Sequence, residues 1–439
     1  MVDSASGLSM VKTISVEELS SIQSDPGVTV IDARPTAAYN GWRLRGETRG
    51  GHVPGAVAFP RSWMAGMSDG DLEELLSSKE IAADDPIVVY GYDDDDATVI
   101  AGRLAELGHG DVAILDSGFL GWAANDNHEV IQLPRFRQLV YPEWLHRLLQ
   151  GELVDEAPKG GFALFHVNSD TPAAYERGHI PGAFYLDTNV LESPADWNRR
   201  SVEELEAALL ELGITSDTSV LLYGRDGAYN EADDGPGEAG LIAAARAAGI
   251  LLYAGVEDVR LLDGGIGAWL AAGYPVETVA RTPVPAAAFG ASIPAHADYF
   301  IDFEEANDVL VNPDGVLVSV RSRPEHFGET SGYDYIQEAG DIPGAVWGNS
   351  GTDANHMEHY RNVDDTMRAF DEISANWEAI GITPEREVTF YCGTGSRASE
   401  AFFYAYLMGW SNISIYDGGW FEWSRRSEKR SEKRSEQPS

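Results

Sequence analysis

The single cysteine of this 439-residue chain lies where a reactive cysteine is expected. Cys392 follows an apolar segment predicted to be a strand, 388–391, and precedes the turn Gly-Thr-Gly-Ser at 393–396. Arg397 follows this turn, and residues 398–408 are predicted to form a helix. The N–H groups of such a turn and helix start point to one spot, where they stabilise an anion. The thiolate is the nucleophilic form of cysteine, so Cys392 is predicted to be the catalytic residue.

A buried, inert core residue is the alternative interpretation of Cys392, because free cysteines are among the most buried residues. The combination of strand, glycine-rich turn, arginine and helix favours the nucleophile. Only four residues separate Cys392 from Arg397. This spacing is shorter than in cysteine-dependent phosphatases, and it fits one added sulfur atom better than a phosphoryl group. The residues predicted to bind the substrate are Gly393, Thr394, Gly395, Ser396 and Arg397.

The charge of the chain is strongly negative. Aspartate and glutamate number 71 against 31 lysines and arginines, which gives a formal net charge of −40. Lysine is scarce, and the acidic residues are spread along the chain. An acidic, lysine-poor surface keeps a protein soluble in concentrated salt, so we hypothesise a halophilic source. The same charge argues against nucleic acid and anionic membranes as partners.

The sequence also indicates the compartment. No run of eighteen apolar residues is present, so no membrane span is predicted. The first residues have neither the basic start nor the apolar core of a secretory signal. One cysteine cannot form an internal disulfide, which agrees with a reducing cytoplasm. We therefore expect a cytoplasmic protein.

The chain contains three copies of one pattern. In each copy an apolar strand leads to a turn of the type Gly-His-Ile-Pro-Gly-Ala, and a later strand leads to a glycine turn ahead of tryptophan. The first turns lie at 51–56, 178–183 and 340–345, and the second at 116–122, 263–269 and 417–423. Short apolar strands alternate with amphipathic helices in each copy, which predicts an α/β fold with a parallel sheet flanked by helices.

The spacing of these copies predicts three tandem domains. Proline-containing segments separate them. The tail repeats Ser-Glu-Lys-Arg without a large apolar side chain, so it is predicted to be disordered. The predicted bounds are 11–134, 135–285 and 290–424 for the domains and 425–439 for the tail.

The repeated signatures resemble those of rhodanese domains, and the Cys392 loop resembles the rhodanese active-site loop. Three tandem domains with this loop in the last resemble multi-domain bacterial sulfurtransferases. The resemblance implies that Cys392 takes a sulfane sulfur as a persulfide and passes it to a thiophilic acceptor, such as a thiol or cyanide. No cofactor or metal is implied, because the enzyme itself carries the sulfur. Two positions depart from the family pattern: Asp341 replaces the usual His, and Ser319 replaces the usual Asp before Arg321.

The first two domains are predicted to be inactive. Counting back from the glycine turns places Gly91 and Gly224 at the cysteine position. Acidic runs follow both glycines, at 93–96 and 231–235, and they would repel a sulfur oxyanion. We expect these domains to be structural and to pack against the third domain.

The sulfur donor is expected to be thiosulfate or 3-mercaptopyruvate, and arginines should hold its anionic end. The candidates are Arg397 and Arg321, with Arg323 weaker; a structural ion pair is the alternative role of Arg321. The loop start Cys-Gly-Thr-Gly resembles the mercaptopyruvate type, whereas thiosulfate-type loops carry a basic residue directly after the cysteine. We predict a thiosulfate sulfurtransferase, with mercaptopyruvate sulfurtransferase and a non-enzymatic rhodanese-fold scaffold as alternatives.

Two histidines are possible metal ligands. His356 and His359 are three residues apart and flank Glu358, a spacing that could place ligands on one helical face. The sequence offers no evident third ligand, so no metal site is predicted.

The acidic composition predicts that the protein gains stability in salt. Carboxylate repulsion is screened as the Debye length falls to about 3 Å at 1 M salt. The melting temperature should therefore rise from low salt to several molar KCl. A melting temperature that stays flat or falls over this range would contradict the halophilic hypothesis.

Overall fold

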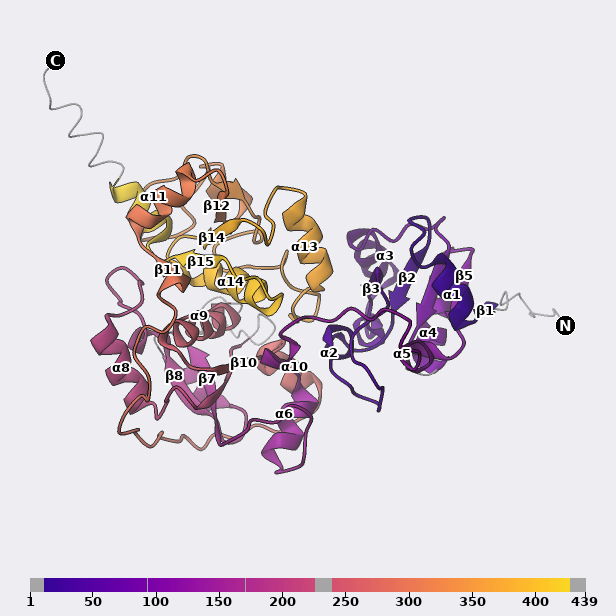
Figure 1. Cartoon of the computed structure of the whole chain (residues 1–439), viewed down its shortest axis with the longest axis horizontal. Coiled ribbons are helices and arrows are strands. Elements are labelled where there is room, and N and C mark those ends of the chain that lie inside the picture. Colours follow the sequence, from indigo (N-terminus) through magenta and orange to yellow (C-terminus); the bar gives the residue numbers. More distant parts are fainter. Residues whose placement is uncertain (1–11, 93, 170, 226–238, 427–439) are drawn as a thin grey trace, which may run out of the picture. The chain divides into compact units, whose positions relative to one another are not determined.

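The structure is a computed structural model that describes residues 12–92, 94–169, 171–225 and 239–426. It contains three five-stranded sheets, one for each repeat, and the strands in each sheet are parallel (Figure 1). Each sheet has the same strand order: first, fifth, fourth, second, third. The predicted α/β fold of three tandem domains is confirmed. The first domain forms one compact unit, and the second and third domains together form another.

The first domain surrounds the sheet β1-β5-β4-β2-β3. Its strands are β1 (Lys12–Ile14), β2 (Thr29–Asp32), β3 (Ala56–Ala58), β4 (Ile87–Tyr90) and β5 (Val112–Leu115). Its α-helices are α1 (Val16–Ile22), α2 (Thr36–Asn40), α3 (Asp69–Ser78), α4 (Asp94–Glu106) and α5 (Gly118–Ala123).

The second domain repeats this order in the sheet β6-β10-β9-β7-β8. Its strands are β6 (Leu139–Val140), β7 (Phe162–Asn168), β8 (Phe184–Asp187), β9 (Ser219–Tyr223) and β10 (Asp258–Leu262). Its α-helices are α6 (Pro142–Leu149), α7 (Ala173–Arg177), α8 (Val202–Glu211), α9 (Ala239–Ala254) and α10 (Gly265–Ala271).

The third domain is built on the sheet β11-β15-β14-β12-β13. Its strands are β11 (Phe300–Ile301), β12 (Gly315–Ser319), β13 (Val346–Trp347), β14 (Glu387–Tyr391) and β15 (Ile413–Tyr416). Its α-helices are α11 (Phe303–Val311), α12 (Arg323–His326), α13 (Phe370–Glu378) and α14 (Ser396–Leu407). A final helix covers residues 419–426.

Local sequence explains these elements. The central strands are almost continuously apolar and buried, as expected for parallel strands covered on both faces. Capping boxes begin several helices, where a side chain at the N-cap and an acidic residue three positions later bond each other's backbone. Such boxes are formed by Ser15 with Glu18, Ser68 with Asp71, Ser201 with Glu204 and Asp302 with Glu305.

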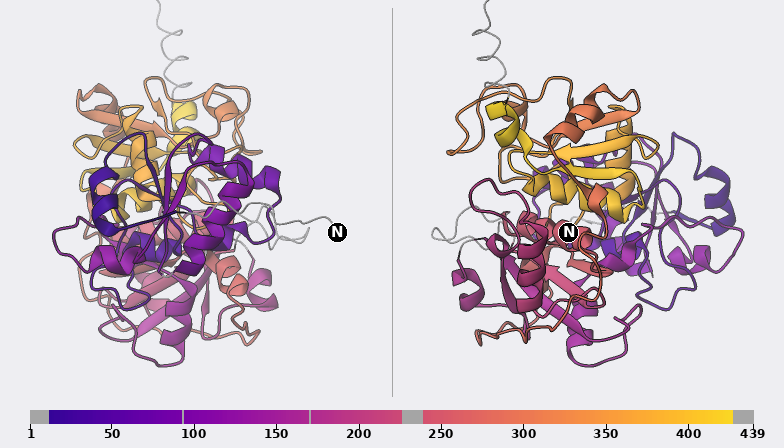
Figure 2. Two further views of the ribbon diagram at one scale, coloured as in Figure 1. Left: turned by 90° about the vertical axis from the view of Figure 1, so that its right-hand side faces the viewer. Right: turned by 60° about the vertical axis from the view of Figure 1, so that its left-hand side comes forward.

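The second and third domains meet through equivalent helices. Helices α9 and α14, which follow the fourth strand of their sheets, pack against each other. Figure 1 shows them side by side, and the right-hand view of Figure 2 shows the two domains from another direction. The Cys392 loop, which precedes α14, is thereby brought close to the second domain. The candidate site around Cys392 therefore contains residues from two domains.

The described residues include no helix long and apolar enough to cross a membrane. The tryptophans after the glycine turns are buried: Trp122 and Trp269 are 1% and 0% exposed, and Trp423 packs against Phe303 with ring centroids 4.9 Å apart. They are core residues. Most of the predicted tail, from residue 427 on, lies outside the described residues.

Candidate active site

The Cys392 loop joins β14 to α14 in the third domain. Cys392 is 1% exposed, and the carbonyls of Cys392 and Gly393 accept hydrogen bonds from the N–H groups of Trp420 and Phe421, at 2.9 and 3.0 Å. Gly395 has a φ of 92°, a left-handed conformation that favours glycine, and α14 begins at the next residue. The first N–H groups of a helix have no partner within it, so those of α14 can serve an anion at this loop.

Equivalent hydrogen bonds identify the matching positions in the other domains. The carbonyl of Gly91 accepts from the N–H of Phe119 at 2.9 Å, and that of Gly224 accepts from Ile266 at 3.0 Å. The two glycines therefore occupy the place of Cys392, as counted from the sequence, and bring no nucleophile. Asp93 and the acidic run 231–235 lie outside the described residues, so inactivity of these domains stays a prediction.

Arg397 is held by a buried ion pair. Its Nη2 donates to Glu325 Oε1 at 2.8 Å and to the Tyr333 hydroxyl oxygen at 2.8 Å. Its Nη1 donates to Glu325 Oε2, to Ser350 Oγ and to the Asp353 carbonyl. Its Nε is buried without a hydrogen-bond partner among the described residues. Contact with a donor anion stays a prediction for Arg397, since most of its donors already have protein partners.

Arg321 shares the same carboxylate. Its Nε lies 3.4 Å from Glu325 Oε1, and its other nitrogens donate to the carbonyls of Gly340 and Ser331. Burial would raise the pKa of Glu325, but Arg397 and then Arg321 outweigh it and lower the pKa to about 2. Glu325 is therefore a stable anion that holds both arginines. Arg323 is exposed and lies 3.8 Å from Glu329.

Asp341 explains one departure from the family pattern. In the first domain, Asp32 at the end of β2 pairs with Arg34 at 2.6 Å and accepts from the Tyr90 hydroxyl. In the third domain the equivalent strand ends in Ser319, which donates to Asp341 at 2.6 Å. The carboxylate has moved from the strand to the turn and still meets an arginine and a tyrosine, Arg321 and Tyr391.

Tyr333 packs directly against the loop. A Cβ on Gly393 would lie 2.7 Å from the Tyr333 hydroxyl oxygen and even closer to its ring. Position 393 therefore has no room for a side chain while Tyr333 keeps its place. This is where thiosulfate-type loops carry a basic residue. Burial raises the pKa of Tyr333 far above its usual value, so its hydroxyl keeps the proton at neutral pH.

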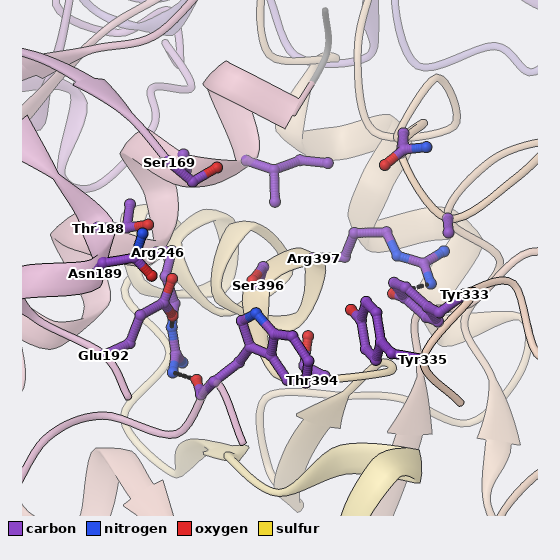
Figure 3. A pocket seen from close by; sticks show the side chains of 15 residues that line it. Ser169, Thr188, Asn189, Glu192, Arg246, Tyr333, Tyr335, Thr394, Ser396 and Arg397 are labelled. Carbon is purple, nitrogen blue, oxygen red and sulfur yellow. Dashed lines mark hydrogen bonds and ion pairs between the residues drawn. The ribbon is translucent and has the colours of Figure 1, made fainter. Parts of the chain in front are cut away.

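A cavity of about 190 Å³ lies beside the loop (Figure 3). The loop contributes Thr394, Ser396 and Arg397, and a neighbouring segment of the third domain contributes Tyr333 and Tyr335. Burial raises the pKa of Tyr335 to about 12, so this phenol also keeps its proton. The cavity therefore offers hydroxyl groups and aromatic faces next to the cysteine loop.

The second domain supplies the opposite wall. Trp197 stacks on Tyr335 with ring centroids 4.1 Å apart and meets Phe421 edge-on at 5.4 Å. Glu192 and Arg246 also line the cavity, joined by an ion pair of 2.9 Å. The domain predicted to be structural thus contributes side chains to the cavity beside Cys392.

Only part of this site is predictable from the sequence. Of the predicted loop residues, Thr394, Ser396 and Arg397 lie in the cavity wall; Arg321 and Cys392 are buried and do not line it. Five further residues of the wall were not predicted: Tyr333, Tyr335, Trp197, Glu192 and Arg246. The aromatic pair around Asp334 was a weak signal for the first two. No local pattern marked the second-domain residues.

The two candidate metal ligands His356 and His359 do not line the cavity beside the Cys392 loop. His356 Nδ1 is 2.6 Å from Asp353 Oδ1, and burial lowers the pKa of His359. The part of the chain that the structure describes holds no group of three or more His, Cys, Asp or Glu arranged to bind a metal ion.

Comparison with known proteins assigns the fold to a family. The family sequence model named Rhodanese-like domain matches residues 15–125, 142–272 and 302–426. The chain belongs to the rhodanese family. Each match covers the last four strands of one of the three parallel sheets, so the family pattern and the observed architecture agree.

Several rhodanese relatives are similar over most of the chain. YnjE of Escherichia coli, a thiosulfate sulfurtransferase, is 45% identical over 90% of this chain and 86% of its own length. TtuD of Thermus thermophilus, a sulfur carrier protein, is 34% identical over 57% of this chain and 83% of its own. The anaerobic ergothioneine biosynthesis enzyme of Chlorobium limicola, solved with its natural substrate trimethyl histidine, is 44% identical. That match has a TM-score of 0.91 and covers 94% of this chain and 97% of that one.

A further solved structure adds a chemical state. EanB with a tyrosine replaced by phenylalanine carries a persulfide on a cysteine, in a tetrahedral intermediate state with ergothioneine. It is 43% identical, with a TM-score of 0.91 and coverage of 95% of this chain and 98% of that one. Together with the relatives named as sulfurtransferases, it identifies this rhodanese as an enzyme, a sulfurtransferase.

The contact between Gly393 and Tyr333 gives one prediction. Gly393→Ala should lower the sulfur-transfer rate by tenfold or more, because the new Cβ displaces the Tyr333 ring. In a Tyr333→Ala background the same change should have little further effect, since contacting residues are not additive. Steady-state turnover of the four proteins measures this coupling.

A glycine elsewhere provides the control for this cycle. Gly102 has nothing within 4 Å of the place of a Cβ, so Gly102→Ala should keep the wild-type rate. If Gly393→Ala is as harmless as Gly102→Ala, or equally harmful with and without Tyr333, Tyr333 does not fill the space above Gly393.

The Glu325 pair predicts a pH dependence of stability. The pKa of Glu325 is about 2 in the folded state, against an ordinary value of 4.5 in the unfolded chain. Its stabilising effect is therefore complete above pH 4.5 and is lost as pH falls toward 2. The difference in unfolding free energy between wild type and Glu325→Gln should therefore shrink by about 1 kcal/mol from pH 7 to pH 4. Urea denaturation at both pH values measures it. A difference that does not change with pH would show that Glu325 has an ordinary pKa.

Proposed function

We propose that this enzyme transfers a sulfane sulfur through a persulfide on Cys392 to a small organic acceptor bound in the cavity beside the loop. The observation that carries the proposal is the cavity of about 190 Å³, walled by Trp197, Tyr333 and Tyr335. A cyanide ion or a single sulfur atom needs far less room. Aromatic faces of this kind suit a cationic group such as a quaternary ammonium.

Hercynine, the trimethylated histidine, is the first candidate acceptor. In EanB, the replaced tyrosine precedes the persulfide cysteine by as many residues as Tyr333 precedes Cys392. A threonine replaced in complexes with hercynine follows that cysteine by two residues, as Thr394 follows Cys392. Two other cysteines replaced in EanB fall at the positions of Ser319 and Ser350. The residues around the cavity therefore support the same class of acceptor.

The proposed reaction has two half-steps. If thiosulfate is the donor, the thiolate of Cys392 attacks its outer sulfur, an S–S bond forms, and sulfite leaves with the electron pair of the broken S–S bond. The outer persulfide sulfur then forms a bond to an imidazole carbon of the acceptor. The hydrogen of that carbon is lost as a proton, and the S–S bond breaks to restore the Cys392 thiolate. Helix α14 and the loop N–H groups stabilise the thiolate in both steps.

Transfer from thiosulfate to a thiol or cyanide is the second candidate. The thiosulfate sulfurtransferase YnjE, with 45% identity, favours it. Position 393 argues against a thiosulfate-type loop, because Tyr333 occupies the space of a basic side chain there. With 3-mercaptopyruvate as donor, the loop Cys-Gly-Thr-Gly would match its expected type.

Intact-protein mass spectrometry tests the proposal. Wild type and Cys392→Ser are incubated with thiosulfate, 3-mercaptopyruvate or inorganic polysulfide. The wild type should gain one sulfur atom and the variant none. Addition of hercynine should then remove the added sulfur and produce ergothioneine.

Other outcomes decide against parts of the proposal. Sulfur that leaves only to cyanide or a thiol supports the second candidate and excludes hercynine. A wild-type protein that gains no sulfur from any donor would contradict persulfide chemistry and favour a non-enzymatic scaffold.

A further inference from the structure

Two buried ion pairs lie at equivalent places between the second and third domains, with their charges reversed. Arg246 of α9 precedes Asp263 by as many residues as Glu400 of α14 precedes Asp417. Arg246 pairs with Glu192 at 2.9 Å, and Glu400 pairs with Arg361 at 2.6 Å.

The partners of these helix residues are equivalent as well. Each of these partners forms an isolated antiparallel β-bridge with a residue further along the chain: Glu192 with Arg199, and Arg361 with Met367. Each bridge then provides an N–H group to the aspartate of the neighbouring domain. Arg199 donates to Asp417 at 2.8 Å, and Met367 donates to Asp263 at 2.7 Å.

The charge reversal changes the surroundings of the two aspartates. On the catalytic side, Arg246 Nη2 lies 2.7 Å from Asp417 Oδ1, so the aspartate has a buried cation as partner. On the other side the place of Arg246 is taken by Glu400, an anion. Burial raises the pKa of Asp263 to about 8. Of these two aspartates, only Asp417, next to the Cys392 loop, is paired with the arginine of the neighbouring helix, Arg246.

Arg246 connects to the Cys392 loop by two routes. Asp417 begins the glycine turn whose following N–H groups, on Trp420 and Phe421, bind the carbonyls of Cys392 and Gly393. Arg246 Nη1 also lies 3.0 Å from the place that a Cβ on Gly395 would occupy. This Nη1 is buried and has no hydrogen-bond partner among the described residues. One guanidinium from the second domain thus contacts the loop itself and the turn that supports it.

We propose that Arg246 is a positioning residue for sulfur transfer at Cys392, supplied to the third domain by the second. The inference rests on the proposed function of Cys392. By holding Asp417 and packing against Gly395, Arg246 fixes the direction of the loop N–H groups toward the cysteine. Arg246 also lines the cavity, but its nitrogens are directed to Glu192, Asp417 and the Trp197 carbonyl. Loop geometry acts on the chemical step, so loss of Arg246 should lower kcat while KM for donor and acceptor stays nearly constant.

The test compares two equivalent buried arginines. Arg246→Met leaves Glu192 without its arginine and takes Arg246 from Asp417, which keeps Arg199. Arg361→Met leaves Glu400 without its arginine, so both variants should lower the melting temperature. Arg246→Met should lower kcat by tenfold or more per folded molecule, with KM within twofold of wild type. Arg361→Met should keep kcat within about threefold, because the carboxylate of Glu400 accepts from Arg361 and the Tyr404 hydroxyl and is not bonded to the glycine turn at 417–419.

Arg246→Lys keeps the experiment decisive if Arg246→Met does not fold. Lysine retains the charge but cannot reach Glu192, Asp417 and the Trp197 carbonyl at once, as arginine does. Its kcat should lie between wild type and Arg246→Met, or clearly below wild type if the methionine variant is lost. Wild-type kcat in Arg246→Lys and Arg246→Met would overturn the proposal.

Three further results separate the possible failures. An increase in KM with unchanged kcat would make Arg246 a substrate contact and contradict a positioning role. Equal losses of kcat in Arg246→Met and Arg361→Met would show that both arginines act only through the packing of the two domains, and would contradict the proposal. Wild-type protein that takes up no sulfur on Cys392 would instead contradict the proposed function, whatever the variants do.

Discussion

The active-site region depends on the buried carboxylate of Glu325. It accepts from Arg397 at 2.8 Å and from Arg321 at 3.4 Å, and all three side chains are almost completely buried. Burying such charges is costly, but removal of one partner typically costs more, about 3–5 kcal/mol, because the other charge is left without compensation. Arg397 in turn donates to the Tyr333 hydroxyl, and Tyr333 covers Gly393. The ion pair therefore fixes the aromatic wall of the cavity as well as the loop.

Much of the architecture was readable from the repeats. The recurring turns placed three copies of one strand order in the chain, and the same counting located Gly91 and Gly224 at the cysteine position. These features are local, and short-range sequence patterns determine them. Arg397 and Arg321 were predicted to face a donor anion, whereas the structure directs most of their donors to Glu325 and nearby backbone. Nothing in the loop sequence indicates a partner that lies so far away along the chain.

The departures from the family pattern make physical sense together. Asp32 in the first domain and Asp341 in the third come from different strands and turns, yet each meets an arginine and a tyrosine. In the second domain His166 holds the strand position, and burial, with Arg225 nearby, lowers its pKa to about 3. A neutral histidine needs no buried counter-charge, and that domain has Asn168 where the others have their arginine. Single substitutions looked anomalous in the sequence because their compensating partners are distant in it.

If Cys392 carries the sulfur as a persulfide, as proposed, the presence of one thiol in the chain limits where that sulfur can go. No second cysteine can attack the persulfide and close a disulfide, so the protein has no internal route for release or for resetting. Each molecule can hold one sulfur atom in this form, and it must wait for an acceptor to enter. The same condition leaves an oxidised Cys392 without a resolving partner inside the protein, so its repair depends on outside thiols. Because Cys392 is only 1% exposed, the protein also shields this persulfide from solvent, which matters in a chain without a resolving cysteine.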